Sequence, residues 1–239
     1  MKKLYDKNEI LFAVLWIVGY CMILAPIRQN CGDESIPMLL VLAAIAAGST
    51  AFILRHHLGE KYGLTVLPRE PKRCLYFLPV WILVTGNLWG GIHPAYSGFS
   101  QVCAVCSMLL VGYAEEVIFR GFLFKALLPK DGTVLSVIIS AATFGIGHII
   151  NLFTGQASLE TVIQILFAIA WGFLFTMIFY KSGSLLPGIA AHGLIDVFSK
   201  FAQDHPTLGW VYTIAVIAVS ALYCTYLARL PEQKAPHTA

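Results

Sequence analysis

Charged residues are scarce in this chain. Asp, Glu, Lys and Arg make up 12% of its 239 residues, whereas 58% of the residues are hydrophobic. Soluble domains carry about 25% charged residues, so the composition excludes an ordinary soluble domain and is typical of a polytopic helical membrane protein. We therefore expect an all-α protein that forms a single membrane domain over residues 1–239, embedded in a lipid bilayer and with no nucleic-acid partner.

Features that would indicate other kinds of protein are also missing. No repeat of solenoid length is visible, and the only C-x-x-C pair, Cys103 and Cys106, has no second pair to complete a metal site. The Lys2–Lys3 start and the apolar run Ile10–Ala25 resemble a signal sequence. However, no A-x-A-like cleavage site follows them, so we expect an uncleaved first membrane span.

Long apolar runs account for most of the chain. Each is near the ~20 residues that a helix needs to cross a bilayer, and together they predict about eight transmembrane helices. The expected spans are Ile10–Pro26, Ile36–Leu54, Leu75–Ile92, Phe99–Leu128, Thr133–Phe153, Leu159–Tyr180, Ser184–Phe198 and Leu208–Leu230. The seventh is short and contains Pro187, so we expect it to be kinked or to span only part of the membrane.

The distribution of basic residues predicts the orientation. If the N-terminus lies inside, the outer segments hold only Arg28 and Lys200 of the 16 Lys and Arg residues. Loops on the cytoplasmic side are enriched in Lys and Arg. We therefore expect an integral membrane protein with both termini in the cytoplasm, and the short loops favour a bacterial cell membrane.

Three ionisable residues interrupt the fourth span. Glu115, Glu116 and Arg120 lie in an otherwise apolar run, and ionisable groups at membrane depth are costly and usually functional. Glu116 and Arg120 are four residues apart, so they share a helix face and can form an ion pair. Glu115 points about 100° away from Glu116 and has no partner within its own segment. We therefore interpret Glu116–Arg120 as a structural pair and Glu115 as the group that is free for chemistry.

Two later spans carry further polar residues. His148 in the fifth span and Glu115 in the fourth each lie roughly 20 Å from their cytoplasmic ends, so they can meet at one depth. His192 and Asp196 in the seventh span are four apart and share a face. Small residues next to the histidines allow helices to approach closely; these are Gly145, Gly147, Gly188 and Gly193.

This set of residues fits two hydrolytic chemistries. In one, Glu115, His148 and His192 bind Zn²⁺ and leave a fourth position for water, whose pKa the metal lowers. In the other, Glu115 acts as general base on a water that His148 helps to position. His192 and Asp196 then stabilise the oxyanion, or Asp196 orients His192. The sequence contains no H-E-x-x-H motif of the ordinary zinc proteases.

Three motifs in order give the chain a family resemblance. Glu115-Glu116-Val-Ile-Phe-Arg120 resembles the E-E-x-x-x-R of the CAAX-protease and bacteriocin-processing (CPBP or Abi) family of intramembrane proteases. Phe144-Gly-Ile-Gly-His148 resembles its F-x-x-x-H, and His192-Gly-Leu-Ile-Asp196 its H-x-x-x-[N/D]. The resemblance covers a catalytic core over roughly residues 100–198.

The resemblance implies a specific activity. It implies an eight-helix intramembrane endopeptidase whose site opens toward the cytoplasm, with Glu115, Glu116, His148, His192 and Asp196 as catalytic residues. The resemblance implies a membrane-associated protein or peptide as substrate, with prenylated proteins included in that class. Many relatives carry Asn where this chain has Asp196, and an ionised Asp can only accept hydrogen bonds.

Other interpretations stay open at this stage. The chain could be a non-catalytic membrane protein for self-immunity to a bacteriocin, or a proton-coupled transporter that uses Glu115, His148 and His192 as a relay. At the level of single residues, Asp196 could form a salt bridge with Lys200. Asn151 could serve as a hydrogen bonder between helices rather than as a catalytic group.

Overall fold

The computed structural model describes residues 1–69, 77–154 and 157–231. Within these residues the regular structure is helical, apart from one isolated bridge between Ile92 and Ala202. The prediction of an all-α protein is confirmed. The helices are α1 (Lys2–Lys7), α2 (Glu9–Cys31), α3 (Ile36–Arg55), α5 (Phe77–Val84), η1 (Thr85–Leu88), α6 (Gly98–Glu115), η2 (Glu116–Phe124), α7 (Lys125–Gly147), η3 (His148–Thr154), α8 (Ser158–Ser182), α9 (Leu186–Ser199) and α10 (Pro206–Arg229).

Side chains and glycines at the helix ends explain several boundaries. The Asn8 side chain accepts a hydrogen bond from the Leu11 amide at the start of α2, and Ser35 accepts one from the Met38 amide at the start of α3. These caps satisfy amides that have no partner within the helix. Gly183, at φ 70°, ends α8 in the left-handed conformation that glycine adopts without strain.

Five helical stretches are long and apolar enough to cross a membrane. They are Glu9–Cys31, Ile36–Arg55, Gly98–Leu152, Ser158–Ser182 and Pro206–Arg229. The third is 55 residues long and turns back at Gly132, whose φ of 71° and ψ of 175° are not helical. Leu78–Leu88 and Leu186–Ser199 are shorter apolar helices. The chain is therefore an integral membrane protein, and the short seventh span is found as predicted.

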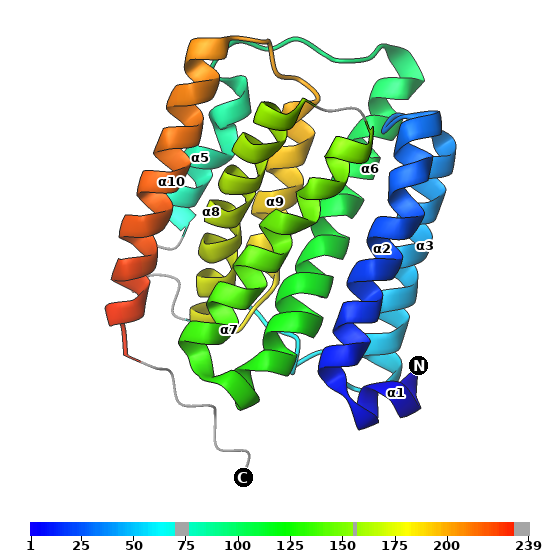
Figure 1. The fold of residues 1–239 in the computed structure, drawn as a ribbon, viewed down its shortest axis with the longest axis vertical. Helices are drawn as coiled ribbons and strands as arrows, with labels where there is room; N and C mark the ends of the chain where they lie inside the picture. The colour runs from blue at the N-terminus through cyan, green and yellow to red at the C-terminus, as the bar shows by residue number, and fades with distance from the viewer. Residues whose placement is uncertain (70–76, 155–156, 232–239) are drawn as a thin grey trace.

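The helices form one bundle with their axes roughly parallel (Figure 1). α6 packs against α9, and α7 against α8, at points where glycine removes the side chain from the contact. A Cβ on Gly112 of α6 would lie 2.5 Å from the Gly193 amide nitrogen of α9, and one on Gly172 of α8 would lie 2.9 Å from the Ala141 Cα of α7. Gly147, by contrast, makes no close approach, because a Cβ there would meet nothing within 4 Å.

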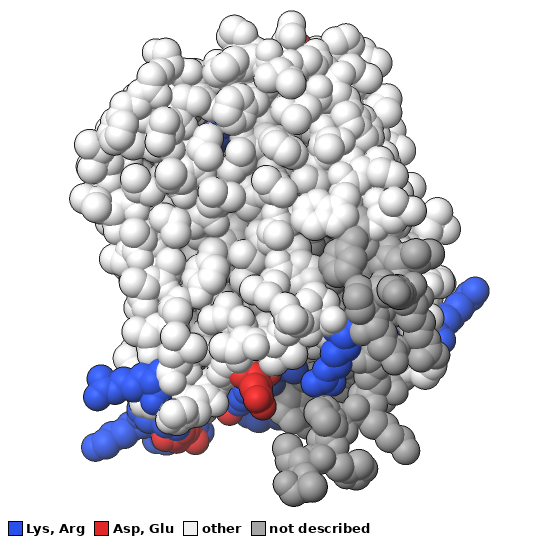
Figure 2. Space-filling model, turned by 180° about the vertical axis from the view of Figure 1, so that it is seen from behind, with Lys and Arg blue, Asp and Glu red and all other residues white. Residues whose placement is uncertain are grey.

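On one face of the bundle, Lys and Arg side chains gather at one end (Figure 2). On the face seen in Figure 2, Lys and Arg cluster at the end that carries the N-terminus in Figure 1, and a broad band of uncharged side chains lies above them. Large hydrophobic side chains on the helices are also exposed; Leu222 on α10 is 73% and Leu40 on α3 63% accessible. An apolar belt next to a charged end is the surface expected of a protein embedded in lipid.

Candidate active site

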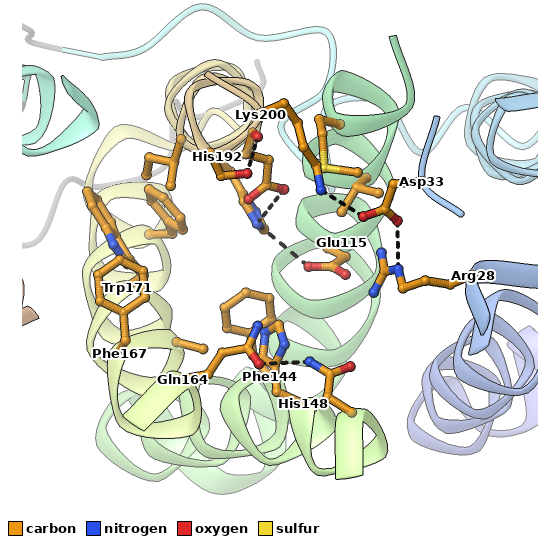
Figure 3. Close-up of a pocket in the computed structure, with 18 residues that line it drawn as sticks. Arg28, Asp33, Glu115, Phe144, His148, Gln164, Phe167, Trp171, His192 and Lys200 are labelled. Carbon is orange, nitrogen blue, oxygen red and sulfur yellow. Dashed lines mark hydrogen bonds and ion pairs between the residues drawn. The ribbon is translucent and has the colours of Figure 1, made fainter. Parts of the chain in front are cut away.

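The polar residues predicted from the sequence line one cavity inside the bundle. Its volume is about 340 Å³, and Glu115, His148, His192 and Asp196 all contribute to its wall (Figure 3). Glu115 comes from the end of α6, His148 from the start of η3, and the other two from α9. The structure thus brings together residues from three expected spans, as the depth argument predicted.

Glu116 and Arg120 form a fully buried ion pair behind this cavity. Arg120 Nη1 donates to Glu116 Oε1 at 2.9 Å, and both side chains are 0% exposed. The guanidinium also lies over the Phe144 ring, 4.2 Å from its centroid. Ion pairing and the cation–π contact offset part of the cost of burying the charge, while Glu116 Oε2 and Arg120 Nε and Nη2 have no hydrogen-bond partner among the described residues. The expected pair is therefore present.

The backbone of this pair is not an ordinary α-helix. Residues Glu116–Phe124 form the π-helix η2, which follows α6 directly. π-Helical turns are rare and frequently occur at functional sites. The sequence predicted an α-helix here, because the spacing that pairs Glu116 with Arg120 does not distinguish the two forms. The change of helix type begins next to Glu115, at the wall of the cavity.

Glu116 also fixes the orientation of His192. His192 Nδ1 lies 2.9 Å from Glu116 Oε1, the same oxygen that accepts from Arg120. An ionised carboxylate only accepts hydrogen bonds, so Nδ1 carries the proton of this contact. The His192 ring stacks on Phe175, with 5.4 Å between centroids and 23° between planes. The buried ion pair thus sets both the tautomer and the rotation of the imidazole.

The other nitrogen of His192 faces two carboxylates. Nε2 lies 3.6 Å from Glu115 Oε2 and 3.6 Å from Asp196 Oδ2. Three groups that exchange protons therefore share one corner of the cavity, and a proton on Nε2 or on either carboxyl group relieves the repulsion between the two acids. The expectation that Asp196 stands next to His192 on one face of α9 is borne out by this geometry.

Glu115 has a partner that sequence reasoning missed. The Tyr20 hydroxyl, from the middle of α2, donates to Glu115 Oε1 at 2.8 Å. Tyr20 is 95 residues away along the chain and lies in a long apolar run, so no spacing rule points to it. The Glu115 side chain is 14% exposed and reaches the cavity. Its carboxylate is held by one hydrogen bond and keeps its second oxygen toward His192.

His148 is the least constrained of the four. Its ring packs edge-on against Phe144, with centroids 5.7 Å apart, and it forms no hydrogen bond to the residues that the structure describes. The neighbouring Asn151 donates to Gln164 Oε1 on α8 at 2.7 Å. Asn151 is therefore a hydrogen bonder between helices, as one of the two interpretations predicted. His148 is left free to meet a ligand in the cavity.

The salt bridge considered between Asp196 and Lys200 does not form. Lys200 Nζ instead lies 2.7 Å from Asp33 Oδ2, and Arg28 Nε lies 2.8 Å from Asp33 Oδ1. Burial would raise the pKa of Asp33, but the charges and hydrogen bonds of Arg28 and Lys200 outweigh burial and hold that pKa below its usual value. Lys200 therefore pairs with Asp33, which also pairs with Arg28, and Asp196 remains directed at His192.

The proposed zinc ligands do not converge. Within residues 1–69, 77–154 and 157–231, no three His, Cys, Asp or Glu side chains are arranged to hold a metal ion. His192 already uses Nδ1 for Glu116, and its Nε2 is directed between Glu115 and Asp196. A His₂Glu set needs the donors about 2 Å from a shared centre. The residues present therefore do not fit the metal in this geometry.

The cavity reaches the end of the bundle opposite the N-terminus. Its lining includes Arg28 near the end of α2, Asp33 just after that helix, and Ser199 and Lys200 at the end of α9. In Figure 1 these ends lie far from α1 and from the charged end. The resemblance and the charge distribution together implied a site open on the side of the termini. The cavity extends from the middle of the bundle, where Tyr20 meets Glu115, to the end opposite the N-terminus; the side of the membrane onto which the site opens stays a prediction.

The fold and the site together define a class of protein. It is a helical integral membrane protein whose carboxylates and histidines meet in a cavity within the bundle, supported by a buried ion pair. Residues 98–198 match the family model for Type II CAAX prenyl endopeptidase Rce1-like. The predicted resemblance to the CAAX-protease family is confirmed over this segment, which contains all three motifs. No curated protein and no solved structure matches the chain.

Proposed function

We propose that this protein is an intramembrane endopeptidase that hydrolyses a peptide bond of a membrane-associated protein or peptide. The observation that carries the proposal is the position of Glu115. Its carboxylate lines the cavity 3.6 Å from His192, whose other ring nitrogen is fixed by the buried Glu116–Arg120 pair. A carboxylate and an oriented imidazole next to an accessible cavity are the parts needed for general acid–base hydrolysis. The match to a protease family supports the same reaction class.

In the proposed reaction Glu115 activates a water molecule. The carboxylate takes a proton from the water while the water oxygen attacks the carbonyl carbon of the scissile bond. The tetrahedral intermediate then collapses, the C–N bond breaks, and the proton passes from Glu115, directly or through His192 Nε2, to the leaving amine. The new carboxylic acid passes its remaining proton to the amine, so the products are a carboxylate and a protonated amine, and Glu115 returns to its starting form.

The remaining polar residues divide the supporting roles. His148 is free of other hydrogen bonds among the described residues, so it is the proposed donor to the oxyanion. Asp196 faces Nε2 of His192 and stabilises the proton that Nε2 takes up during the reaction, rather than binding the oxyanion, since an ionised carboxylate cannot donate. Glu116 and Arg120 act through His192 and are positioning residues. The proposed reaction uses no metal ion. Activity that disappears with a chelator and returns with Zn²⁺ would contradict this mechanism.

We also propose that eight segments of one membrane domain cross the bilayer, with both termini in the cytoplasm. The five long helical stretches, the fold-back at Gly132 and the two shorter apolar helices support this count. The charged end near the N-terminus supports the orientation (Figure 2). With that orientation the cavity approaches the outer side of the membrane. A peptide reaching the site from that side is then a better substrate candidate than a prenylated cytoplasmic tail.

The proposal is tested by comparing peptide ends in membranes. Cells express the wild type, Glu115→Gln or Glu160→Gln at matched levels; Glu160 is an exposed acid in the first turn of α8 and serves as control. We expect new peptide ends with the wild type and with Glu160→Gln but not with Glu115→Gln. Identical ends in all three, with all proteins folded, would contradict proteolysis and favour a binding role such as bacteriocin immunity.

A further inference from the structure

A second charged cluster lies at the end of the cavity remote from Glu116. Arg28, Asp33 and Lys200 all line the cavity that contains Glu115, and Asp33 lies between the two cations at 2.8 and 2.7 Å. Their formal charges sum to one positive charge. Arg28 comes from α2 and Lys200 from the end of α9, so the cluster joins two helices across the mouth of the cavity.

Arg28 uses only part of its guanidinium in this cluster. Nε donates to Asp33, and the two terminal nitrogens make no hydrogen bond to the residues that the structure describes. The Arg28 side chain is 36% exposed, and Figure 3 shows it extending from α2 toward the cavity. It also lines the smaller adjoining cavity between α2 and η3, together with Glu115 and Tyr20. The unused donors are thus available to a ligand in either space.

We propose that Arg28 binds a carboxylate of the peptide substrate through its terminal nitrogens and so helps to place the scissile bond next to Glu115. This inference rests on the proposed peptidase function and names a specificity residue for it. The planar guanidinium presents paired N–H groups whose geometry matches a carboxylate. Asp33, which is itself held by Lys200, fixes Nε of Arg28 and so lowers the entropic cost of binding.

The charge of the cluster favours a singly charged ligand. Asp33 cancels one of the two cations, and its low pKa keeps it ionised at neutral pH. Glu115 and Asp196 in the same cavity add negative charge, which disfavours a doubly charged phosphate more than a carboxylate. The cavity of about 340 Å³ is of the size of a small-ligand site. The bound carboxylate therefore lies within a few residues of the cut, either at the C-terminus of the substrate or on an Asp or Glu side chain.

Matched peptides can test this inference. A peptide that spans a cut identified in membranes is made with a free C-terminal carboxylate or a C-terminal amide, and separately with nearby acidic side chains replaced by their amides. We expect purified wild type to lose about 10-fold or more in kcat/KM for one of these neutral forms, since hydrogen bonds to charged groups are stronger than those to neutral groups. The form that loses activity identifies which carboxylate Arg28 binds.

Variants of Arg28 assign the effect to that residue. Arg28→Gln should cleave the acidic and neutral peptides equally, Arg28→Lys should keep part of the preference, and Arg55→Gln, an exposed arginine at the end of α3, should behave as wild type. Asp33→Asn should raise KM more than it lowers kcat, because it frees Arg28 without removing it. Wild type that cleaves all peptides equally, or Arg28→Gln that keeps the preference, would overturn the inference.

Measurements of peptide binding test the role of Arg28 independently of the proposed reaction. In the Glu115→Gln background, fluorescence anisotropy measures peptide affinity without turnover. We expect this variant to bind the acidic peptide at least about 10-fold more tightly than its neutral form, and the added Arg28→Gln to remove the difference. Selective binding without any cleavage by wild type would refute the peptidase function alone. Cleavage without selective binding would refute the role of Arg28 alone.

Discussion

At the scale of single residues, two adjacent glutamates have different environments. Glu116 is fully buried and accepts from Arg120 and His192, whereas Glu115 faces the cavity and accepts from Tyr20. The sequence predicted this division because helical spacing gives Glu116 a partner and leaves Glu115 without one. It could not predict Tyr20, since a tyrosine within an apolar span is also typical of packing or of the membrane interface.

The Tyr20 hydroxyl should matter for catalysis more than for binding. Tyr20→Phe keeps the ring but removes the 2.8 Å hydrogen bond that orients Glu115. We expect kcat to fall about 10-fold or more with KM nearly unchanged, because a hydrogen bond to a charged group is worth about 1.5–3 kcal/mol. Steady-state kinetics with a peptide substrate checks this. An unchanged kcat would show that Glu115 is positioned without Tyr20.

Variants of the buried Glu116–Arg120 pair should affect the stability and the activity of the protein differently. Arg120→Met leaves Glu116 charged and buried with His192 as its remaining partner, and breaking such a pair costs about 3–5 kcal/mol. The double variant Glu116→Gln, Arg120→Met removes both charges and should recover much of that loss. It should stay inactive, because His192 loses its ionised anchor.

Thermal unfolding in detergent and peptide cleavage measure the two effects of this pair. The wild type and both variants are compared under the same conditions. A double variant as active as wild type would contradict the role of Glu116 in orienting His192. A single variant as stable as wild type would show that the pair contributes little to the fold.

At the scale of elements, close contact between α6 and α9 brings the site together. Gly112 on α6 meets the Gly193 backbone on α9, and these two helices carry Glu115 and His192. The sequence predicted that small residues beside the histidines would allow close approach, and Gly193 fits this expectation. Gly147 does not, because glycine in a helix can also face open space, and sequence alone does not distinguish the two situations.

A single methyl group at this contact should be costly. Gly112→Ala places a Cβ 2.5 Å from the Gly193 amide nitrogen, which can move only if the helices separate. We expect a loss of about 1–3 kcal/mol in stability and a marked loss of peptide cleavage. Gly48→Ala on α3 is the matched control, since a Cβ there meets nothing within 4 Å and alanine favours a helix. Equal unfolding temperatures for the two variants would contradict the packing argument.

At the scale of the whole molecule, the charged end and the cavity lie at opposite ends. Composition and apolar runs were sufficient to predict a helical membrane protein, because lipid imposes both length and composition on its spans. Which end of the bundle the cavity reaches was not predictable. It depends on the depth of the polar side chains, and this depth depends on η2, which follows α6, and on η3, which follows α7. The π-helix was likewise not predictable, because the spacing of Glu116 and Arg120 fits either helix type, whereas the short α9 was predicted from the sequence.

Reporter fusions test the proposed orientation. Green fluorescent protein attached after Ala239 should fluoresce, because it folds in the cytoplasm. Alkaline phosphatase attached after Gln203, close to the cavity end of α9, should be active, because it needs the outer side of the membrane. The reverse pattern would place the cavity on the cytoplasmic side and restore cytoplasmic tails as preferred substrates.

The most direct test of the account is cleavage by the purified protein. Wild type, Glu115→Gln and the control Glu160→Gln are reconstituted in lipid vesicles with a peptide that spans a cut found in membranes. We predict equal rates for wild type and the control, and a rate at least about 100-fold lower for Glu115→Gln, the range expected on removal of a general base. Cleavage by Glu115→Gln at the wild-type rate would contradict the central claim that Glu115 activates the attacking water.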